Sequence, residues 1–173
     1  MIRRAAVYFL AISCGMLLAC SAASPAVCSP LRLTASAEAA LADAAASLGV
    51  APQRPCAFRD AFEVAAVVTD TLPGTPPSSR VTFIVTRREE RAFTFSATRA
   101  VVLFSAIPQG THRLRIAAGR TVAEGFAGPS GTGMDSAYLR WRTDDITYEL
   151  AATLHSWLTE ADVRAIATAM LQP

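Results

Sequence analysis

The sequence predicts an α+β domain, in which an antiparallel sheet is flanked by an N-terminal and a C-terminal helix. Three observations predict this class. Short runs with strand-like alternation of apolar and polar residues fill the middle and the last third of the 173-residue chain. Short turns join several of these runs, which favours hairpins. Apolar residues also recur at helical spacing near each end of the domain.

The first predicted helix covers residues 34–48, which are rich in alanine. Its apolar positions recur at helical spacing: Leu41, Ala44, Ala45 and Leu48. Gly49 follows at the place where a helix is expected to end. The small side chains give this helix little apolar surface of its own, so it needs support from the rest of the fold.

Six runs predict strands on the basis of β-branched and aromatic content. They cover residues 61–69, a hairpin over 81–97 with the tip Arg88-Glu89-Glu90-Arg91, residues 100–106, and a pair over 112–118 and 121–126. Proline and glycine predict loops over residues 70–79 and 128–135.

The clearest hairpin turns at Asp144-Asp145. A two-residue turn there pairs Trp141 with Tyr148, Arg140 with Glu149, and Leu139 with Leu150. The aromatic and opposite-charge pairs each contribute roughly 0.2–1 kcal/mol. One register therefore satisfies every pair, with the apolar residues on one face and the charged residues on the other.

The last predicted helix begins with Thr159 as its cap and Asp162 as the capping-box partner, and Leu158 can pack onto Val163. One apolar stripe follows: Val163, Ile166, Ala167, Met170 and Leu171. The stripe is expected to pack against the Trp141/Tyr148 face of the sheet. A helix lying on a membrane is the alternative, but basic flanks are missing.

The beginning of the chain is typical of a bacterial export signal, because Arg3 and Arg4 precede an apolar run of about 15 residues. The stretch Leu17-Leu18-Ala19-Cys20 resembles the lipobox of bacterial lipoproteins, which implies that Cys20 carries lipid. We expect a signal peptide over 1–19, a tether over 20–33 and one domain over 34–173. Cleavage before Cys14, a soluble exported protein and an uncleaved anchor remain alternatives.

Cys28 and Cys56 are left after removal of the signal and lipidation of Cys20. An even pair in an oxidising compartment predicts a disulfide. It would straddle the helix over 34–48 and hold it in place. Metal binding is the alternative, but two cysteines without a nearby histidine are too few ligands for structural zinc.

The charges argue against nucleic acid as a partner. The chain contains no lysine, and residues 20–173 hold as many arginines as acidic residues. Residues 80–120 nevertheless carry eight arginines and two glutamates. These arginines either lie on solvated strand faces and pair with acids elsewhere, or face anionic lipid headgroups at about 1 kcal/mol each.

The pattern Trp141…Tyr148-x-Leu150…Leu158-Thr159-x-x-Asp162-Val163-x-x-Ile166-Ala167 resembles a C-terminal domain of unknown function in exported or membrane-tethered bacterial proteins. That domain is similar in fold to periplasmic lipoprotein carriers and sigma-regulator lipid-sensing proteins. The resemblance implies a curved antiparallel sheet with both helices packed on one face, and a groove for acyl chains or a partner segment.

No pattern in the sequence predicts catalysis, a cofactor or a metal. Ser130 lacks the following glycine of a nucleophile elbow. His112 and His155 lack ligand spacing, and Asp144-Asp145 are explained by the turn. We therefore expect a non-enzymatic lipoprotein of the cell envelope that binds an apolar ligand or an envelope protein. A structural or partner-docking module with a filled core is the alternative, and an envelope hydrolase is the third.

Overall fold

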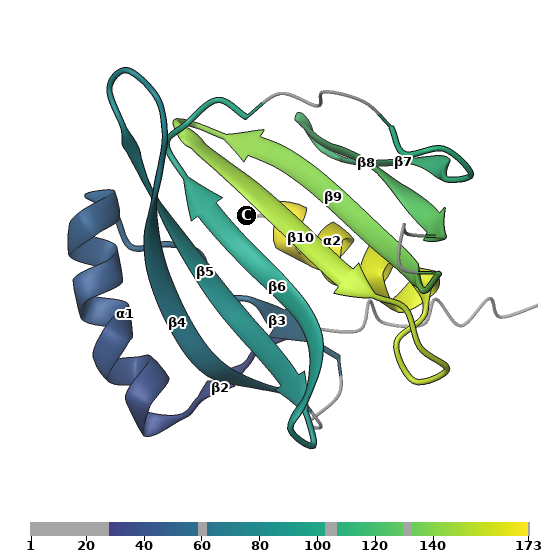
Figure 1. Ribbon diagram of the computed structural model, residues 1–173, viewed down its shortest axis with the longest axis horizontal. Coiled ribbons are helices and arrows are strands. Elements are labelled where there is room, and N and C mark those ends of the chain that lie inside the picture. The colour runs from purple at the N-terminus through teal and green to yellow at the C-terminus, as the bar shows by residue number, and fades with distance from the viewer. Residues whose placement is uncertain (1–27, 59–61, 103–106, 130–132, 173) are drawn as a thin grey trace, which may run out of the picture.

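The computed structural model describes residues 28–58, 62–102, 107–129 and 133–172 (Figure 1). Over these residues the chain forms two helices, an eight-stranded open sheet in the order β2-β4-β5-β6-β10-β9-β8-β7, and a two-stranded sheet of β1 and β3. Every strand pair is antiparallel except β2 with β4. The α+β class is therefore confirmed.

The strands are β1 (Ser29–Pro30), β2 (Arg32–Leu33), β3 (Cys56–Ala57), β4 (Glu63–Leu72), β5 (Ser78–Arg87), β6 (Glu90–Thr98), β7 (His112–Ala118), β8 (Thr121–Pro129), β9 (Asp135–Thr143) and β10 (Ile146–Thr153). The helices are α1 (Ala35–Leu48) and α2 (Glu160–Leu171).

Helix α1 agrees with the helix predicted over residues 34–48. The Thr34 hydroxyl accepts a hydrogen bond from the Ala37 N–H at 3.3 Å, and Gly49 ends the helix with φ of 71°. The helix packs along β4 and β5 and buries Ala37, Ala44 and Leu48. Its small buried side chains provide little apolar area, as the sequence indicates.

The N-terminal segment differs from the predicted tether. Residues 29–30 pair with β3, residues 32–33 pair with β4, and Leu31 is buried. A disulfide joins Cys28 to Cys56, with 5.4 Å between their Cα atoms, as predicted. The tether prediction is therefore wrong for residues 28–33, because backbone pairing and the disulfide make them part of the domain. Residues 20–27 lie outside the described part of the chain.

The hairpin of β5 and β6 is confirmed. Arg88 and Glu89 form its turn with φ of 48° and 71°, which is the left-handed backbone of a type I′ turn. The preceding loop is shorter than the predicted 70–79, because β4 and β5 continue their pairing into it. Asp70 lies opposite Arg80, whose Nε donates to the carboxylate at 3.0 Å, and this charge pair extends both strands.

The predictions for residues 100–153 have different outcomes. The pair of β7 and β8 around Gly119-Arg120 is confirmed, and β9 and β10 pair in the predicted register around Asp144-Asp145. The strand predicted over 100–106 is wrong for residues 100–102, which are irregular, and Val101 is 68% exposed. Residues 103–106 lie outside the described part. The loop predicted over 128–135 is shorter, since Pro129 pairs with Asp135.

Helix α2 has the predicted capping box. The Thr159 hydroxyl accepts from the Asp162 N–H, and the Asp162 carboxylate accepts from the Thr159 N–H at 2.9 Å. The predicted stripe is buried, and α2 packs against β7, β8, β9 and β3. The core is one cluster that contains residues of both helices and large strand side chains: Phe83, Phe93, Phe95, Leu139 and Leu150.

Candidate functional site

The sheet has a core face and a second face. The core face carries Leu139, Trp141 and Leu150, which are buried in the main cluster. Because side chains alternate along a strand, Tyr138 and Arg140 lie on the opposite side, which we call the second face. This face holds the features that are not explained by core packing.

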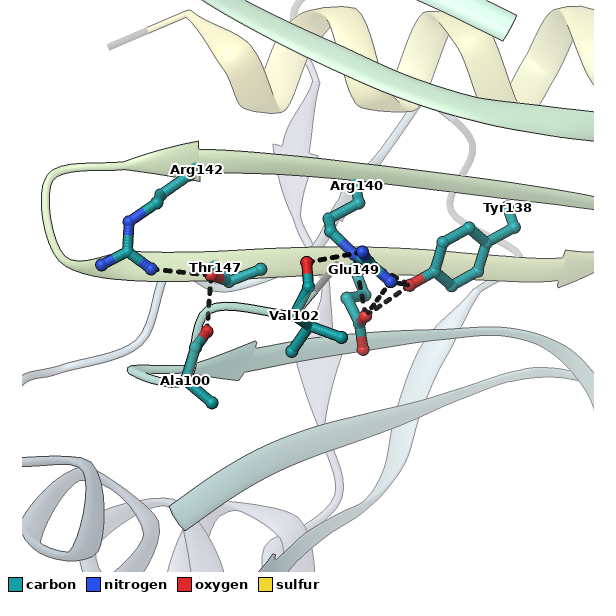
Figure 2. A network of polar contacts seen from close by, with 7 residues as sticks. All are labelled: Ala100, Val102, Tyr138, Arg140, Arg142, Thr147 and Glu149. Atoms are coloured by element: carbon teal, nitrogen blue, oxygen red, sulfur yellow. Dashed lines mark hydrogen bonds and ion pairs between the residues drawn. The ribbon is translucent and has the colours of Figure 1, made fainter. Parts of the chain in front are cut away.

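A polar network occupies the centre of the second face (Figure 2). Arg140 and Glu149 lie opposite each other on β9 and β10 and form an ion pair at 3.1 Å, with side chains only 12% and 14% exposed. The Tyr138 hydroxyl donates to Glu149 and accepts from Arg140 Nη2 at 2.7 Å. Each charge is thus both paired and hydrogen-bonded, as partial burial requires.

The network also holds residues 99–102, which we call the crossing segment. Arg140 Nη1 donates to the Val102 carbonyl at 2.6 Å, and the Thr147 hydroxyl donates to the Ala100 carbonyl at 2.8 Å (Figure 2). Arg142 in turn donates to the Thr147 hydroxyl at 2.9 Å. Side chains of the sheet therefore donate hydrogen bonds to backbone carbonyls of this irregular segment. These bonds hold the segment against the sheet without strand pairing.

Burial raises the pKa of the Tyr138 hydroxyl well above its ordinary value, and its hydrogen bond to Glu149 raises the pKa further. Arg140 opposes this shift but is outweighed. The hydroxyl therefore stays protonated at neutral pH and acts as a donor to Glu149. It is unsuited to act as a base or a phenolate nucleophile.

A groove of about 330 Å³ lies beside this network. A row of residues paired from strand to strand crosses the groove. Thr94 and Ala151 are opposite each other in this row, and their small side chains leave a depression in the second face. Tyr138 and Phe126 continue the row, with their rings stacked at 5.4 Å between centroids. The described lining is Arg91, Ala92, Phe93, Thr94, Phe126, Ser136, Ala137, Tyr138, Ala151, Ala152 and Thr153.

This lining is suited to binding. It combines aromatic and alanine surface with the hydroxyls of Thr94, Ser136 and Thr153, and Arg91 supplies one cation. The described lining residues include no histidine, aspartate or glutamate that could serve as a general base beside Ser136. Apolar surface with a few polar groups is the usual composition of a small-molecule site.

The groove lining includes none of four described residues that were candidates for catalysis or metal binding: His112, His155, Asp144 and Asp145. His112 Nε2 is 2.9 Å from Glu160 Oε2, and the His155 ring stacks on the Trp157 ring with 4.6 Å between the ring centroids. Asp144-Asp145 form the β9–β10 turn, as predicted. Ser130 and Cys20 lie outside the described residues. In the part of the chain that the structure describes, no three His, Cys, Asp or Glu side chains gather as metal ligands.

The sequence pattern indicates half of the network, and the resemblance implies a groove without indicating the residues that line it. It paired Arg140 with Glu149, but it assigned no role to Tyr138. A usable signal exists: Tyr138 stands two residues before Arg140 on one strand face, within reach of the same carboxylate. The groove has no comparable signal, because its small residues come from strands β6, β9 and β10.

No family model, curated protein or solved structure matches this chain. No helix among the described residues is both long enough and apolar enough to cross a bilayer.

Proposed function

We propose that this protein is a non-enzymatic lipoprotein of the cell envelope, anchored through Cys20, whose domain binds a small ligand with an apolar body. The observation that carries the binding proposal is the 330 Å³ groove on the second face. Its volume falls within the range of about 300–1,000 Å³ typical of ligand pockets. Arg91 at the groove suits a ligand with an acidic group.

The anchor is supported by the lipobox-like stretch before Cys20 and by the Cys28–Cys56 disulfide. Disulfides persist in oxidising compartments such as the periplasm and the cell surface. Only seven residues separate Cys20 from Cys28. Fully extended, this connection spans less than about 30 Å, so the anchored domain would stay close to the bilayer.

We further propose that the sheet is curved and that both helices cover the same face, as in the lipid-binding folds that the C-terminal pattern resembles. This arrangement is supported by the shared core cluster, in which residues of α1 and α2 join Phe83 and Leu139. In this arrangement the groove lies on the face away from the helices. A ligand would then enter the second face without displacing either helix.

The anchor is tested by labelling cells with a palmitate analogue. Wild-type protein is expected to take up label and to remain with the membrane fraction, and Cys20→Ala is expected to lose both. A matched Cys14→Ala variant should retain label. An unmodified thiol at position 20 in the native protein would overturn the anchor while leaving the groove open to its own test.

The groove is tested with octanoate, which has an apolar chain and one carboxylate. Titration calorimetry on wild type should give saturable binding. Ala151→Trp should abolish it by filling the floor, and Arg91→Gln should weaken it several-fold. Ala39→Trp, at an exposed position of α1, is the matched control. Equal binding by the Ala151 and Ala39 variants would refute the groove as the ligand site.

A partner-docking module is the second candidate. The observation that favours it is the filled core, in which large side chains such as Phe83, Phe95 and Leu150 are fully buried. Native mass spectrometry after gentle purification distinguishes the ligand-binding function from the docking function. A co-purified small molecule supports the ligand-binding function, and protein without one, together with failed octanoate binding, supports docking.

A further inference from the structure

Strand β7 is the last strand of the eight-stranded sheet. It is paired with β8 over all seven of its residues without a bulge, and no strand among the described residues pairs with its other side. A regular, unpaired edge of this length can accept another extended chain by backbone hydrogen bonding. The side chains beside the edge decide which chain it accepts.

A row of alternating charges leads to this edge across the second face. Glu149 pairs with Arg140, Arg140 lies opposite Glu124, and Glu124 lies opposite Arg115 on β7. The last pair is loose and exposed, with 3.6 Å between Arg115 Nε and Glu124 Oε1. The next position in this row, beyond β7, would lie beside Arg115 and favours a carboxylate, since opposite charges across strands are stabilising.

The neighbouring row ends in the same way. Tyr138 lies opposite Phe126, and Phe126 lies opposite Arg113 on β7. Arg113 is exposed and has no acidic residue across from it on β8. Arg113 and Arg115 therefore present two cations on the same face of the edge, two residues apart, while Leu114 and Ile116 are buried on the core face.

We propose that β7 recruits an extended segment of another protein in which two acidic residues alternate with apolar residues. The acidic side chains would lie beside Arg113 and Arg115, and the apolar side chains would extend the Leu114/Ile116 side toward α2, which already packs against β7. This inference does not depend on lipidation of Cys20 or on the groove.

Two other occupants fit the edge less well. A second copy pairing antiparallel about Leu114 or Arg115 would set arginines opposite each other, which is destabilising. The segment of residues 20–27 in this chain contains no aspartate or glutamate. Charge complementarity therefore favours a different, acidic partner.

The backbone groups involved follow from the turn. Gly119-Arg120 is a two-residue turn closed by the pair Ala118 and Thr121. In such a hairpin the closing pair is hydrogen-bonded and the next pair is not. The N–H groups of Arg113, Arg115 and Ala117 therefore point away from β8, to the open edge.

The test uses the blocked peptide Thr-Val-Glu-Val-Glu-Val-Thr and the isotope-labelled full chain in detergent micelles. Hydrogen exchange followed by NMR is expected to slow at least tenfold at Arg113, Arg115 and Ala117, and to change little at Leu114 and Ile116. The peptide with glutamine in place of both glutamates should bind at least tenfold more weakly. Raising the salt concentration to 0.5 M should also weaken binding of the glutamate peptide.

Three variants test whether the peptide binds to the edge of β7. Arg113→Glu combined with Arg115→Glu should abolish peptide binding, whereas Arg120→Glu, a charge change in the turn, should leave it within twofold. Ala117→Pro should also abolish binding by removing an outward N–H, while an unchanged Tm verifies the fold. Unchanged exchange at saturating peptide, equal binding of the glutamine peptide, or protection that rises with protein concentration alone would overturn the proposal.

Discussion

The two faces of the β9–β10 hairpin are both largely buried, but by different interactions. On the core face, Leu139 and Leu150 are fully buried among apolar side chains. On the second face, Arg140 and Glu149 are covered through hydrogen bonds to each other, to Tyr138 and to the crossing segment. One strand pair can therefore carry a nondirectional hydrophobic contact on one side and a directional polar site on the other.

Leu150→Ala is expected to have the largest effect, because it opens a cavity in the core face. We expect a loss of about 3 kcal/mol in the free energy of unfolding, within the usual range of 2–5 kcal/mol for such a change. Urea unfolding monitored by circular dichroism measures it. Leu33→Ala, at a half-buried position of β2, is the control and should cost less. A loss below 1 kcal/mol would contradict close packing at Leu150.

Breaking the ion pair on the second face should cost less than the cavity. Glu149→Leu leaves Arg140 partly buried without its carboxylate, and we expect a loss of about 2 kcal/mol. The double variant Arg140→Met with Glu149→Leu should recover most of this loss, because no uncompensated charge remains. Urea unfolding of the two single variants and the double variant completes the cycle. Additive losses would show that the pair is energetically uncoupled.

The two tyrosines of the hairpin lie on opposite faces and allow a direct comparison by pH. Burial raises the pKa of both Tyr138 and Tyr148 above the ordinary value near 10. Above this value the unfolded chain releases protons that the folded chain keeps, so the free energy of unfolding falls as pH rises. The absence of lysine leaves few other groups titrating in this range.

We therefore expect Tyr138→Phe and Tyr148→Phe each to make this alkaline loss of stability shallower. The effect should be larger for Tyr138, because its hydrogen bond to Glu149 adds to the effect of burial. Absorbance at 295 nm measures ionisation, and thermal unfolding between pH 8 and 11 measures stability. Ionisation of Tyr138 at a lower pH than Tyr148 would contradict a hydrogen bond from the Tyr138 hydroxyl to Glu149 in the folded protein.

Thr147→Val should have the smallest effect. It removes the hydroxyl that donates to the Ala100 carbonyl and accepts from Arg142, at a cost of about 1 kcal/mol. The change should mainly loosen the crossing segment, so faster hydrogen exchange at residues 99–102 is the sensitive measurement. Thr143→Val, at an exposed position of the same hairpin, is the control. Equal exchange in both variants would show that the bond does not fasten the segment.

Local patterns were enough to predict several elements. The β9–β10 register follows from one two-residue turn and three complementary pairs, and the start of α2 follows from Thr159 and Asp162. These features depend on residues that are close in sequence. The predicted loop over 70–79 was too long because proline and glycine content outweighed the Asp70–Arg80 pair, which lies ten residues apart.

The hairpins, the two helices, the disulfide partners and the expectation of export could be predicted without a structure, because each depends on short-range periodicity, capping or residue counts. The path of the crossing segment, the groove and the edge at β7 follow from the folded arrangement of the strands. The groove residues come from β6, β8, β9 and β10, and β6 lies beside β10 only through the order of the sheet. Alternation along one strand shows which residues share a face, but only assembly of all eight strands shows what that face can bind.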